Sequence, residues 1–173
     1  MQNKPGFLLI ECMLVLTLTA FLVGLSFSLV HVFERLLVRS EVDLLINAIE
    51  AQRAVAVIDG KDNAIVFNKE QNQYKYGAIN HTFARSVGFV YPSDSYGPPS
   101  APTMLIQKPL SFVDNKIVCF ATGAMSSGVL YIGSVAQNCF YALSSSISEW
   151  GVLRLYWYDG NTWRKEKASI FEN

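Results

Sequence analysis

Hydrophobic residues dominate the first part of the chain. Between residues 7 and 30 the only charged side chain is Glu11. A helix of about 20 apolar residues is long enough to cross the hydrocarbon core of a bilayer, since each residue adds about 1.5 Å. Lys4 precedes the run, and a positive charge at this end favours a cytoplasmic N-terminus. The pattern therefore predicts a transmembrane segment over 7–33, with the rest of the chain on the other side of the membrane.

Beyond this run the hydrophobic positions become periodic. From 34 to 58 they recur with the i, i+3, i+4, i+7 spacing of an amphipathic helix. The residues of this stripe are Val38, Val42, Leu45, Ile46, Ile49 and Val57. Gly24 is the only glycine or proline between 7 and 59, so we expect one helix of about 50 residues through both segments. The turn residues of "IDGKDN" (58–63) should end it, and its apolar stripe should pack on a sheet.

The remaining residues, 59–173, form a pattern of strands separated by turns. Short runs rich in β-branched and aromatic residues predict strands at 64–68, 73–77, 81–86, 104–107, 110–113, 116–121, 129–134, 139–144, 152–158 and 162–166. Four of the six prolines fall between 91 and 103, which predicts a loop there. Asp159-Gly160 indicates a hairpin turn. The predicted fold class is α+β, with a long N-terminal helix packed on an antiparallel β-sheet.

The charge balance gives no sign of nucleic-acid binding, because 14 basic and 14 acidic side chains sum to zero. The segment "WRKEK" (163–167) is locally basic and lies near Trp157 and Tyr158, and basic residues interleaved with aromatic ones can bind single-stranded nucleic acid. The same residues also fit an ordinary solvated hairpin. No metal-ligand spacing, phosphate-binding loop or nucleophile motif is present in the sequence, so we expect no metal, no cofactor and no enzymatic activity.

The chain contains three cysteines. Cys12 lies in the apolar run, whereas Cys119 and Cys139 lie in strand-like segments. Two such cysteines in an exported domain can form a disulfide. Two buried thiols are the alternative, and the sequence leaves both open.

A plain membrane segment does not explain Glu11. A charged side chain at the centre of a membrane helix costs about 3 kcal/mol or more. A cleaved signal peptide has a shorter apolar core than this one, and a signal anchor leaves the carboxylate without a role. The third interpretation is a segment that is cut short and whose carboxylate then gains a partner.

The residues before Glu11 carry a family resemblance. The stretch "KPGFLLIE" (4–11) resembles the processing site of type IV pilins and type II secretion pseudopilins. The resemblance implies that a prepilin peptidase cuts after Gly6 and that the new amine of Phe7 is methylated. Glu11 then becomes the fifth residue of the mature chain, as in that family.

The same resemblance implies a role for Glu11 in assembly. Its carboxylate can pair with the Phe7 amine of a neighbouring subunit, and such a pair is much stronger in low dielectric than in water. Either charge alone remains costly there. Pairing would favour a filament with a fixed stagger between subunits. The alternative is that Glu11 only reaches up to the lipid headgroups.

A second resemblance covers residues 117–158. Their order of an aromatic strand, a loop of small residues between glycines and a later basic strand is similar to the C-terminal half of GspH/FimT-type minor pseudopilins. The matching residues are Gly123, Gly128, Leu130, Tyr131, Gly151 and Arg154. The two resemblances imply a pilin-like fold divided into a leader peptide (1–6), a transmembrane half-helix (7–33), an amphipathic half-helix (34–58) and a periplasmic β-rich domain (59–173).

The implied function is that of a minor pseudopilin, processed after Gly6 and assembled into a short periplasmic filament of a type II secretion system that drives protein secretion. The implied partners are a prepilin peptidase, other pseudopilin or pilin subunits, inner-membrane lipid and secreted cargo. The implied location is the bacterial inner membrane, with a single pass and a cytoplasmic N-terminus. Two alternatives stay open. One is a FimT-like minor pilin of a type IV pilus or competence system that binds DNA, and the other is an uncleaved, membrane-anchored β domain of unrelated role.

Overall fold

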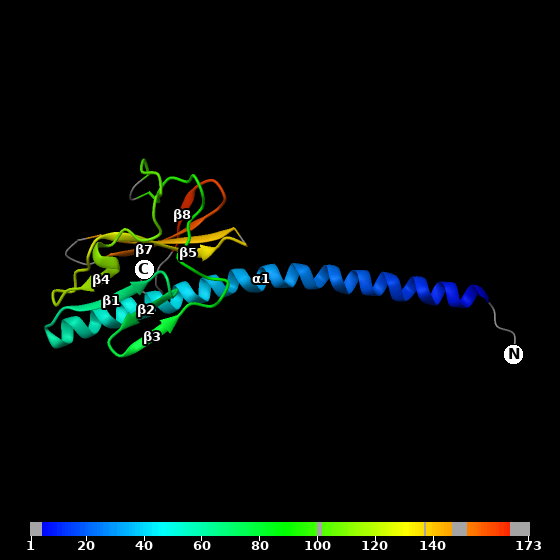
Figure 1. Ribbon diagram of the computed structural model, residues 1–173, viewed down its shortest axis with the longest axis horizontal. Coiled ribbons are helices and arrows are strands. Elements are labelled where there is room, and N and C mark those ends of the chain that lie inside the picture. Colours follow the sequence, from blue (N-terminus) through cyan, green and yellow to red (C-terminus); the bar gives the residue numbers. More distant parts are fainter. Residues whose placement is uncertain (1–4, 100–101, 137, 147–151, 167–173) are drawn as a thin grey trace. The chain divides into compact units, whose positions relative to one another are not determined.

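A computed structural model describes residues 5–99, 102–136, 138–146 and 152–166, apart from the side chains of 5–8 and 25–31 (Figure 1). The chain divides into two compact units, Met1–Leu36 and Leu37–Asn173. The first unit contains the beginning of helix α1 (Pro5–Asp59). The second contains the rest of α1 and the strands that follow it.

Both ends of α1 carry residues that suit them. Pro5 stands at the first helical position, where its missing N–H costs no hydrogen bond and its fixed φ fits the helix. At the other end Gly60 adopts a φ of 62°, and the N–H of Lys61 donates to the carbonyl of Ala56 over 3.2 Å. This is the hydrogen bond of a Schellman motif. The predicted end of the helix at "IDGKDN" is therefore confirmed.

The first half of α1 differs from the prediction. Within the described parts of the chain, no helix is both long and apolar enough to cross a membrane. The predicted transmembrane segment over 7–33 and the single-pass inner-membrane location are therefore wrong, and the predicted fold class is wrong in the same respect. In α1 the described side chains are those of residues 9–24, with Glu11 among them, and those of residues 32–59. The expected contact with inner-membrane lipid rested on this predicted transmembrane segment.

Two antiparallel sheets follow α1, where the sequence predicted one. The first has the order β3-β2-β1-β4 and consists of β1 (Asn63–Asn68), β2 (Gln73–Tyr76), β3 (Ile79–Thr82) and β4 (Lys116–Cys119). The second follows the chain order and consists of β5 (Gly128–Ser134), β6 (Cys139–Ser145), β7 (Leu153–Tyr158) and β8 (Trp163–Glu166). A short 3-10 turn, η1 (Val113–Asn115), precedes β4. The α+β class holds in general, but the β part has two four-stranded layers.

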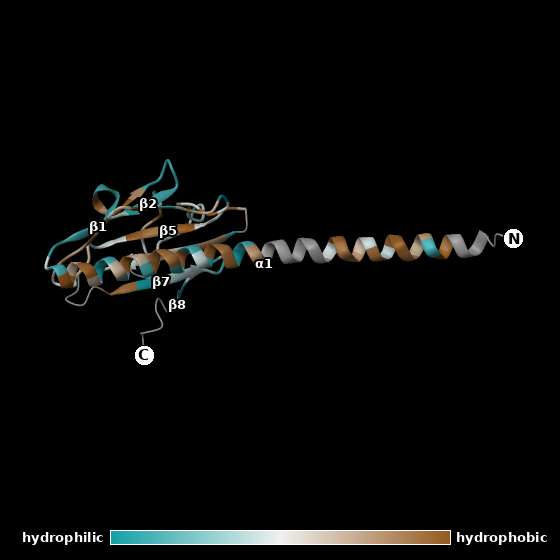
Figure 2. Ribbon diagram, turned by 90° about the horizontal axis from the view of Figure 1, so that it is seen from below, coloured by the Kyte–Doolittle hydropathy of each residue, from teal (hydrophilic) through white to brown (hydrophobic). Residues whose placement is uncertain are grey.

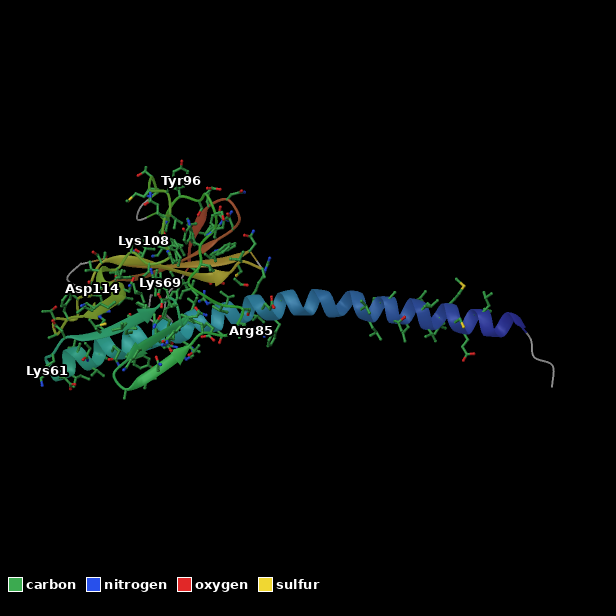
Figure 3. The ribbon with its side chains drawn as sticks, viewed as in Figure 1. Lys61, Lys69, Arg85, Tyr96, Lys108 and Asp114 are labelled. Carbon is green, nitrogen blue, oxygen red and sulfur yellow. The ribbon has the colours of Figure 1, made fainter. Side chains whose placement is uncertain are left out.

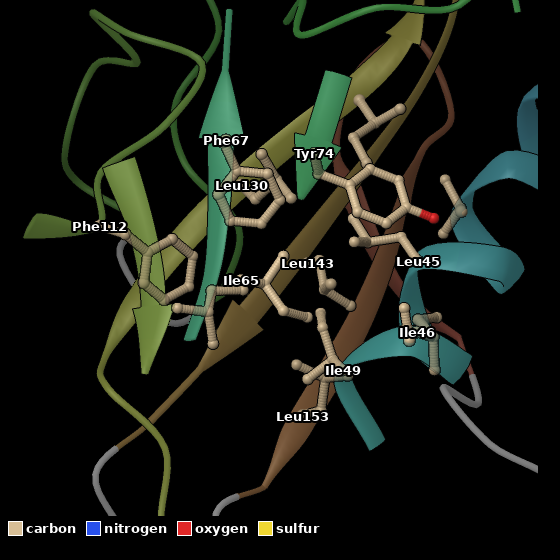
Figure 4. Close-up of a cluster of buried hydrophobic side chains, with 14 of the residues drawn as sticks. Leu45, Ile46, Ile49, Ile65, Phe67, Tyr74, Phe112, Leu130, Leu143 and Leu153 are labelled. Atoms are coloured by element: carbon tan, nitrogen blue, oxygen red, sulfur yellow. The ribbon is translucent and has the colours of Figure 1, made fainter. Parts of the chain in front are cut away.

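The second sheet separates two hydrophobic clusters, because successive side chains of a strand point to opposite faces. On the face toward α1, the main core joins the helix to both sheets (Figure 4) and includes Leu45, Ile49, Ile65, Phe67, Leu130 and Leu143. On the opposite face a second, more aromatic cluster contains Ile106, Tyr131, Phe140, Ala142, Tyr156 and Trp163. Each fully buried Leu, Ile or Phe side chain contributes about 1.5–3 kcal/mol.

The predicted apolar stripe of α1 is confirmed along most of its length. Its first five residues are at most 3% exposed: Val38, Val42, Leu45, Ile46 and Ile49. Val57 is 50% exposed, whereas Ala56 is completely buried. Position 56 lies about two helical turns after 49, so Ala56 continues the buried side and Val57 has turned away from it.

Residues 104–107 and 110–113 form only isolated bridges, although strands were predicted there. Residues 110–113 run along the edge of β5. The N–H of Ser111 donates to the carbonyl of Val129 over 2.9 Å, and the Ser111 hydroxyl accepts from the N–H of Val129 over 2.7 Å. Pro109 has no N–H to donate, so the pairing stays irregular.

Candidate functional site

The expected processing site lies at the start of α1. Gly6 and Phe7 fall in its first turn, and their side chains lie outside the described residues. Glu11 is described and exposed, and its carboxylate has no ion pair or hydrogen bond with any described residue. It lies one helical turn after Phe7.

The helix surface around Glu11 is apolar on all sides. Large hydrophobic side chains that are between 53% and 68% exposed are Leu9, Ile10, Met13, Leu14, Val15, Leu16, Leu18, Phe21, Leu22 and Val23. Thr17 and Thr19 add no free hydroxyl, because each donates within the helix, to the carbonyls of Leu14 and Val15, over 2.9 Å. Burial of such a surface is worth about 25 cal/mol per Å². This part of α1 therefore gains by contact with another apolar surface, and Glu11 is its one described charge.

In the second unit α1 carries an uncharged stripe on its solvent side, called the outer stripe below. It consists of Ser40, Leu44, Asn47, Ala51, Val55 and Ile58, all of them exposed. Spacings of three and four place them along one side of the helix, opposite to the buried stripe. Leu44 is 48% and Ile58 81% exposed. Figure 2 shows hydrophobic and hydrophilic positions alternating along this length of α1.

Charged side chains beside the outer stripe are held against the β-rich domain. Arg39 lies 3.0 Å from Asp43 and 2.6 Å from Glu166 of β8, and its guanidinium lies 5.7 Å from the centre of the Tyr141 ring. Farther along, Nε of Arg53 donates to the carbonyl of Gly123 over 2.7 Å. These contacts hold the helix on the sheets with its uncharged side facing outward.

Glu41 is the one charged residue among those of α1 that are described as buried. Its Oε2 lies 2.8 Å from Nε2 of His81, and its Oε1 accepts from the N–H of Ala84 over 3.1 Å. The His81 ring in turn lies 4.9 Å from the ring of Tyr74, centre to centre. Burial, followed by the charges of Tyr76 and Glu41, raises the pKa of the Tyr74 phenol. Glu41 therefore fastens α1 to β3 and to the segment after it.

Cys119 and Cys139, both described, are not joined by a disulfide. Cys119 ends β4 in the first sheet and Cys139 begins β6 in the second. The Cys119 thiol is buried, 3.9 Å from the carbonyl of Ile49, and burial raises its pKa to about 11. The Cys139 thiol is only half-buried, so of these two thiols Cys119 alone is buried. Among the described residues, no three His, Cys, Asp or Glu side chains are grouped so as to hold a metal ion.

The basic and aromatic residues near the C-terminal hairpin do not form one surface. Arg164 lies 2.6 Å from Asp159, so its charge is locally balanced. Trp157 pairs with Tyr141 on the α1 side of the sheet, whereas Trp163 packs in the cluster on the other side. Elsewhere on the domain, Figure 3 shows Lys61, Arg85 and Lys108 at separate corners.

Several residues of the second resemblance have clear structural roles. Gly123 has a φ of +83°, which side chains rarely adopt. A Cβ on Gly128 would meet the ring of Phe112 at 2.5 Å. Leu130 and Tyr131 are buried on opposite faces of β5, and Arg154 is half-buried on β7. Gly151 lies outside the described residues.

Comparison with protein-family models, with curated proteins and with solved structures finds no match for this chain.

Proposed function

We propose that the chain is a filament subunit of the minor pseudopilin kind, cut after Gly6 by a prepilin peptidase and assembled through α1 into a short filament of a type II secretion system. One observation carries the proposal: the described residues 9–23 form a helix whose large apolar side chains are all more than half exposed around the exposed Glu11. Such a surface favours association with other helices.

Processing at Gly6 suits the start of a helix. The first four N–H groups of a helix have no partner within it, so its first turn opens at little cost. Glycine is also a poor helix former, which keeps the peptide after Gly6 accessible to an enzyme. Cleavage there would leave Phe7 with a free amine at the helix N-terminus, where the helix dipole is already positive.

Glu11 supplies the negative charge that can pair with this positively charged amine. In the assembly a carboxylate from a neighbouring helix would offset both the amine and the dipole at Phe7. The pair would be surrounded by the apolar residues 9–23, where charge pairs are strong and single charges costly. Subunits would therefore dock at the one stagger that brings the two groups together.

The outer stripe gives the second unit a surface for the same purpose. It is uncharged and exposed, and Arg39 and Arg53 beside it are held by contacts with the β-rich domain. A neighbouring helix could pack along it without burying a charge. The alternative of a DNA-binding minor pilin has less support, since Arg164 is paired and Lys61, Arg85 and Lys108 are widely separated (Figure 3).

The decisive experiment measures the N-terminal mass of the full-length protein from cells with and without a prepilin peptidase. We expect a chain that begins at methylated Phe7, and that is seen only when the peptidase is present. Retention of residues 1–6 in both strains would overturn the proposal.

Assembly is tested separately through the exposed Cys12, which adjoins Glu11. A bismaleimide joins two thiols, so it should cross-link neighbouring processed chains through Cys12, and Glu11→Gln should abolish most of this cross-linking while leaving cleavage intact. Glu70→Gln, at an exposed turn outside α1, is the matched control. Equal cross-linking of the Glu11 variant and the parent would contradict the assembly step alone.

A further inference from the structure

A pocket of about 440 Å³ lies between residues 94–97, Pro99 and Pro102 on one side and the β7–β8 turn on the other. It is on the face of the second sheet away from α1, where Figure 1 shows the loop and β8. Its aromatic walls are Tyr96, Tyr158 and Trp163, and its polar groups include Asp94 and Asn161. Nothing in the proposed assembly uses this side of the domain.

The loop wall of the pocket is held in place by hydrogen bonds. The indole N–H of Trp163 donates to the carbonyl of Tyr96 over 2.8 Å. Across the loop, the N–H of Gly97 donates to the carbonyl of Met104 over 2.9 Å. The Ser95 hydroxyl, buried at the base, donates to the carbonyl of Pro92 over 2.8 Å. The pocket is therefore formed before any ligand arrives, which limits the ordering cost of binding.

The opposite wall is held by Asp159 in the β7–β8 turn. Its carboxylate accepts from the N–H groups of Asn161 and Thr162 over 2.9 and 2.8 Å, and it pairs with Arg164. The nearby cation is thus already neutralised. None of the described residues that line the pocket is a lysine or an arginine.

Asp94 leaves the pocket with an unbalanced negative charge. Its side chain is exposed and has no ion pair or hydrogen bond with any described residue. Aromatic rings such as those of Tyr96 and Tyr158 attract cations through their faces. A carboxylate and aromatic rings around one space, without a competing cation, favour a positively charged ligand.

The surroundings of the pocket indicate that this cation is part of a polypeptide. Tyr96 and Leu105 are 60% and 49% exposed, and the bridge between them places their side chains next to each other on one ridge. An apolar ridge beside a charged pocket offers contact area that a small amine would not use. We propose that this pocket binds a lysine or arginine side chain carried by a segment of a partner protein.

The proposal does not depend on filament assembly and is tested on the full-length chain in solution. The probe is the peptide acetyl-Gly-Ala-Lys-Ala-Gly-amide, and the control peptide has norleucine, of similar shape but uncharged, in place of lysine. Binding is followed by the ¹H–¹⁵N resonance of the Trp163 indole, identified by elimination with Trp150→Phe and Trp157→Phe. We expect saturable shifts at millimolar peptide with lysine, and binding at least about tenfold weaker with norleucine.

Asp94→Asn is the decisive variant. Asp94 has a φ of 53°, and asparagine tolerates this backbone conformation as well as aspartate does, so the loop should keep its shape. We expect binding of the lysine peptide to weaken about fivefold or more. The matched control is Asp114→Asn, since Asp114 is also exposed, has a φ of 54° and lies far from Tyr96 (Figure 3).

Three outcomes would overturn the proposal. The first is the absence of any shift of the Trp163 indole at millimolar lysine peptide. The second is equal binding of the norleucine peptide, which would define an apolar contact without charge selection. The third is equal weakening by Asp94→Asn and Asp114→Asn, which would reflect only the overall charge of the protein.

Discussion

Oε2 of Glu41 lies 2.8 Å from Nε2 of His81, so a buried carboxylate of α1 holds the edge strand β3 of the first sheet. The other oxygen of the same carboxylate accepts from the N–H of Ala84. One side chain thus satisfies two donors from the segment where the chain leaves β3.

Replacing Glu41 by alanine should destabilise the domain. The half-buried N–H of Ala84 and ring nitrogen of His81 would lose their acceptor, at a cost near the lower end of the range of about 1–3 kcal/mol for an unsatisfied buried group. Urea unfolding followed by circular dichroism measures the change, with exposed Glu70→Ala as the control. An unchanged midpoint for Glu41→Ala would mean that water replaces the carboxylate without cost.

Two aliphatic residues of α1 should respond very differently to truncation. Ile49 is completely buried in the main core (Figure 4), and Ile49→Ala should cost about 2–5 kcal/mol. Leu44, five positions earlier on the outer stripe, is 48% exposed, and Leu44→Ala should change stability by less than about 0.5 kcal/mol. Equal losses in denaturant unfolding would show that the outer stripe is covered within the isolated chain.

The β7–β8 turn should weaken in acid. The N–H groups of Thr162 and Asn161, and then Arg164, hold the pKa of Asp159 well below its usual range. A depressed folded-state pKa contributes stability above the unfolded pKa of about 3.9, and this contribution is lost as the pH falls below it. The stability gap between the parent and Asp159→Asn, measured by urea unfolding, should therefore narrow from about pH 6 to about pH 3. A gap that stays constant over that range would contradict this assignment.

The thiols of Cys12 and Cys119 should react at very different rates. Cys12 is exposed, whereas Cys119 is buried with a pKa raised to about 11, first by burial and then by the charge of Glu50. Since the thiolate is the reactive form, a maleimide at neutral pH should modify Cys12 quickly and Cys119 only on unfolding. Peptide mass mapping over time gives both rates. Rapid labelling of Cys119 in the native state would mean that β4 opens away from α1.

The sequence predicted the parts of the fold that local pattern controls. The period of α1 identified five of its buried residues from Val38 to Ile49, though not Glu41 or Ala48, and Asp159-Gly160 located the β7–β8 hairpin. The sequence-based prediction failed where contacts between distant parts of the chain determine the local structure. Residues 81–86 have the composition of a strand, but β3 ends at Thr82 because the next segment turns toward Glu41 and the second sheet.

The candidate sites show the same division. The positions of Gly6, Phe7 and Glu11 follow from a short motif. The outer stripe lies on the side of α1 opposite to the predicted apolar stripe, so its exposure could also be predicted. The pocket beside Asp94 was not predictable, because it joins a proline-rich loop to a hairpin far along the chain. The alternation of side chains along a strand could have predicted that Trp157 and Tyr158 lie on opposite faces of the sheet and do not share one surface.

The hydroxyls of Thr17 and Thr19, which are bonded to their own helix, have a consequence for the geometry of the proposed assembly. With those hydroxyl donors used within the helix, Glu11 is the one described charge that residues 9–23 offer a neighbour, so sliding one helix along another changes mainly the distance to that carboxylate. The axial rise per subunit would then depend on a single residue. Moving the carboxylate one turn, by Glu11→Val with Val15→Glu, should change the rise by about 6 Å rather than abolish the filament.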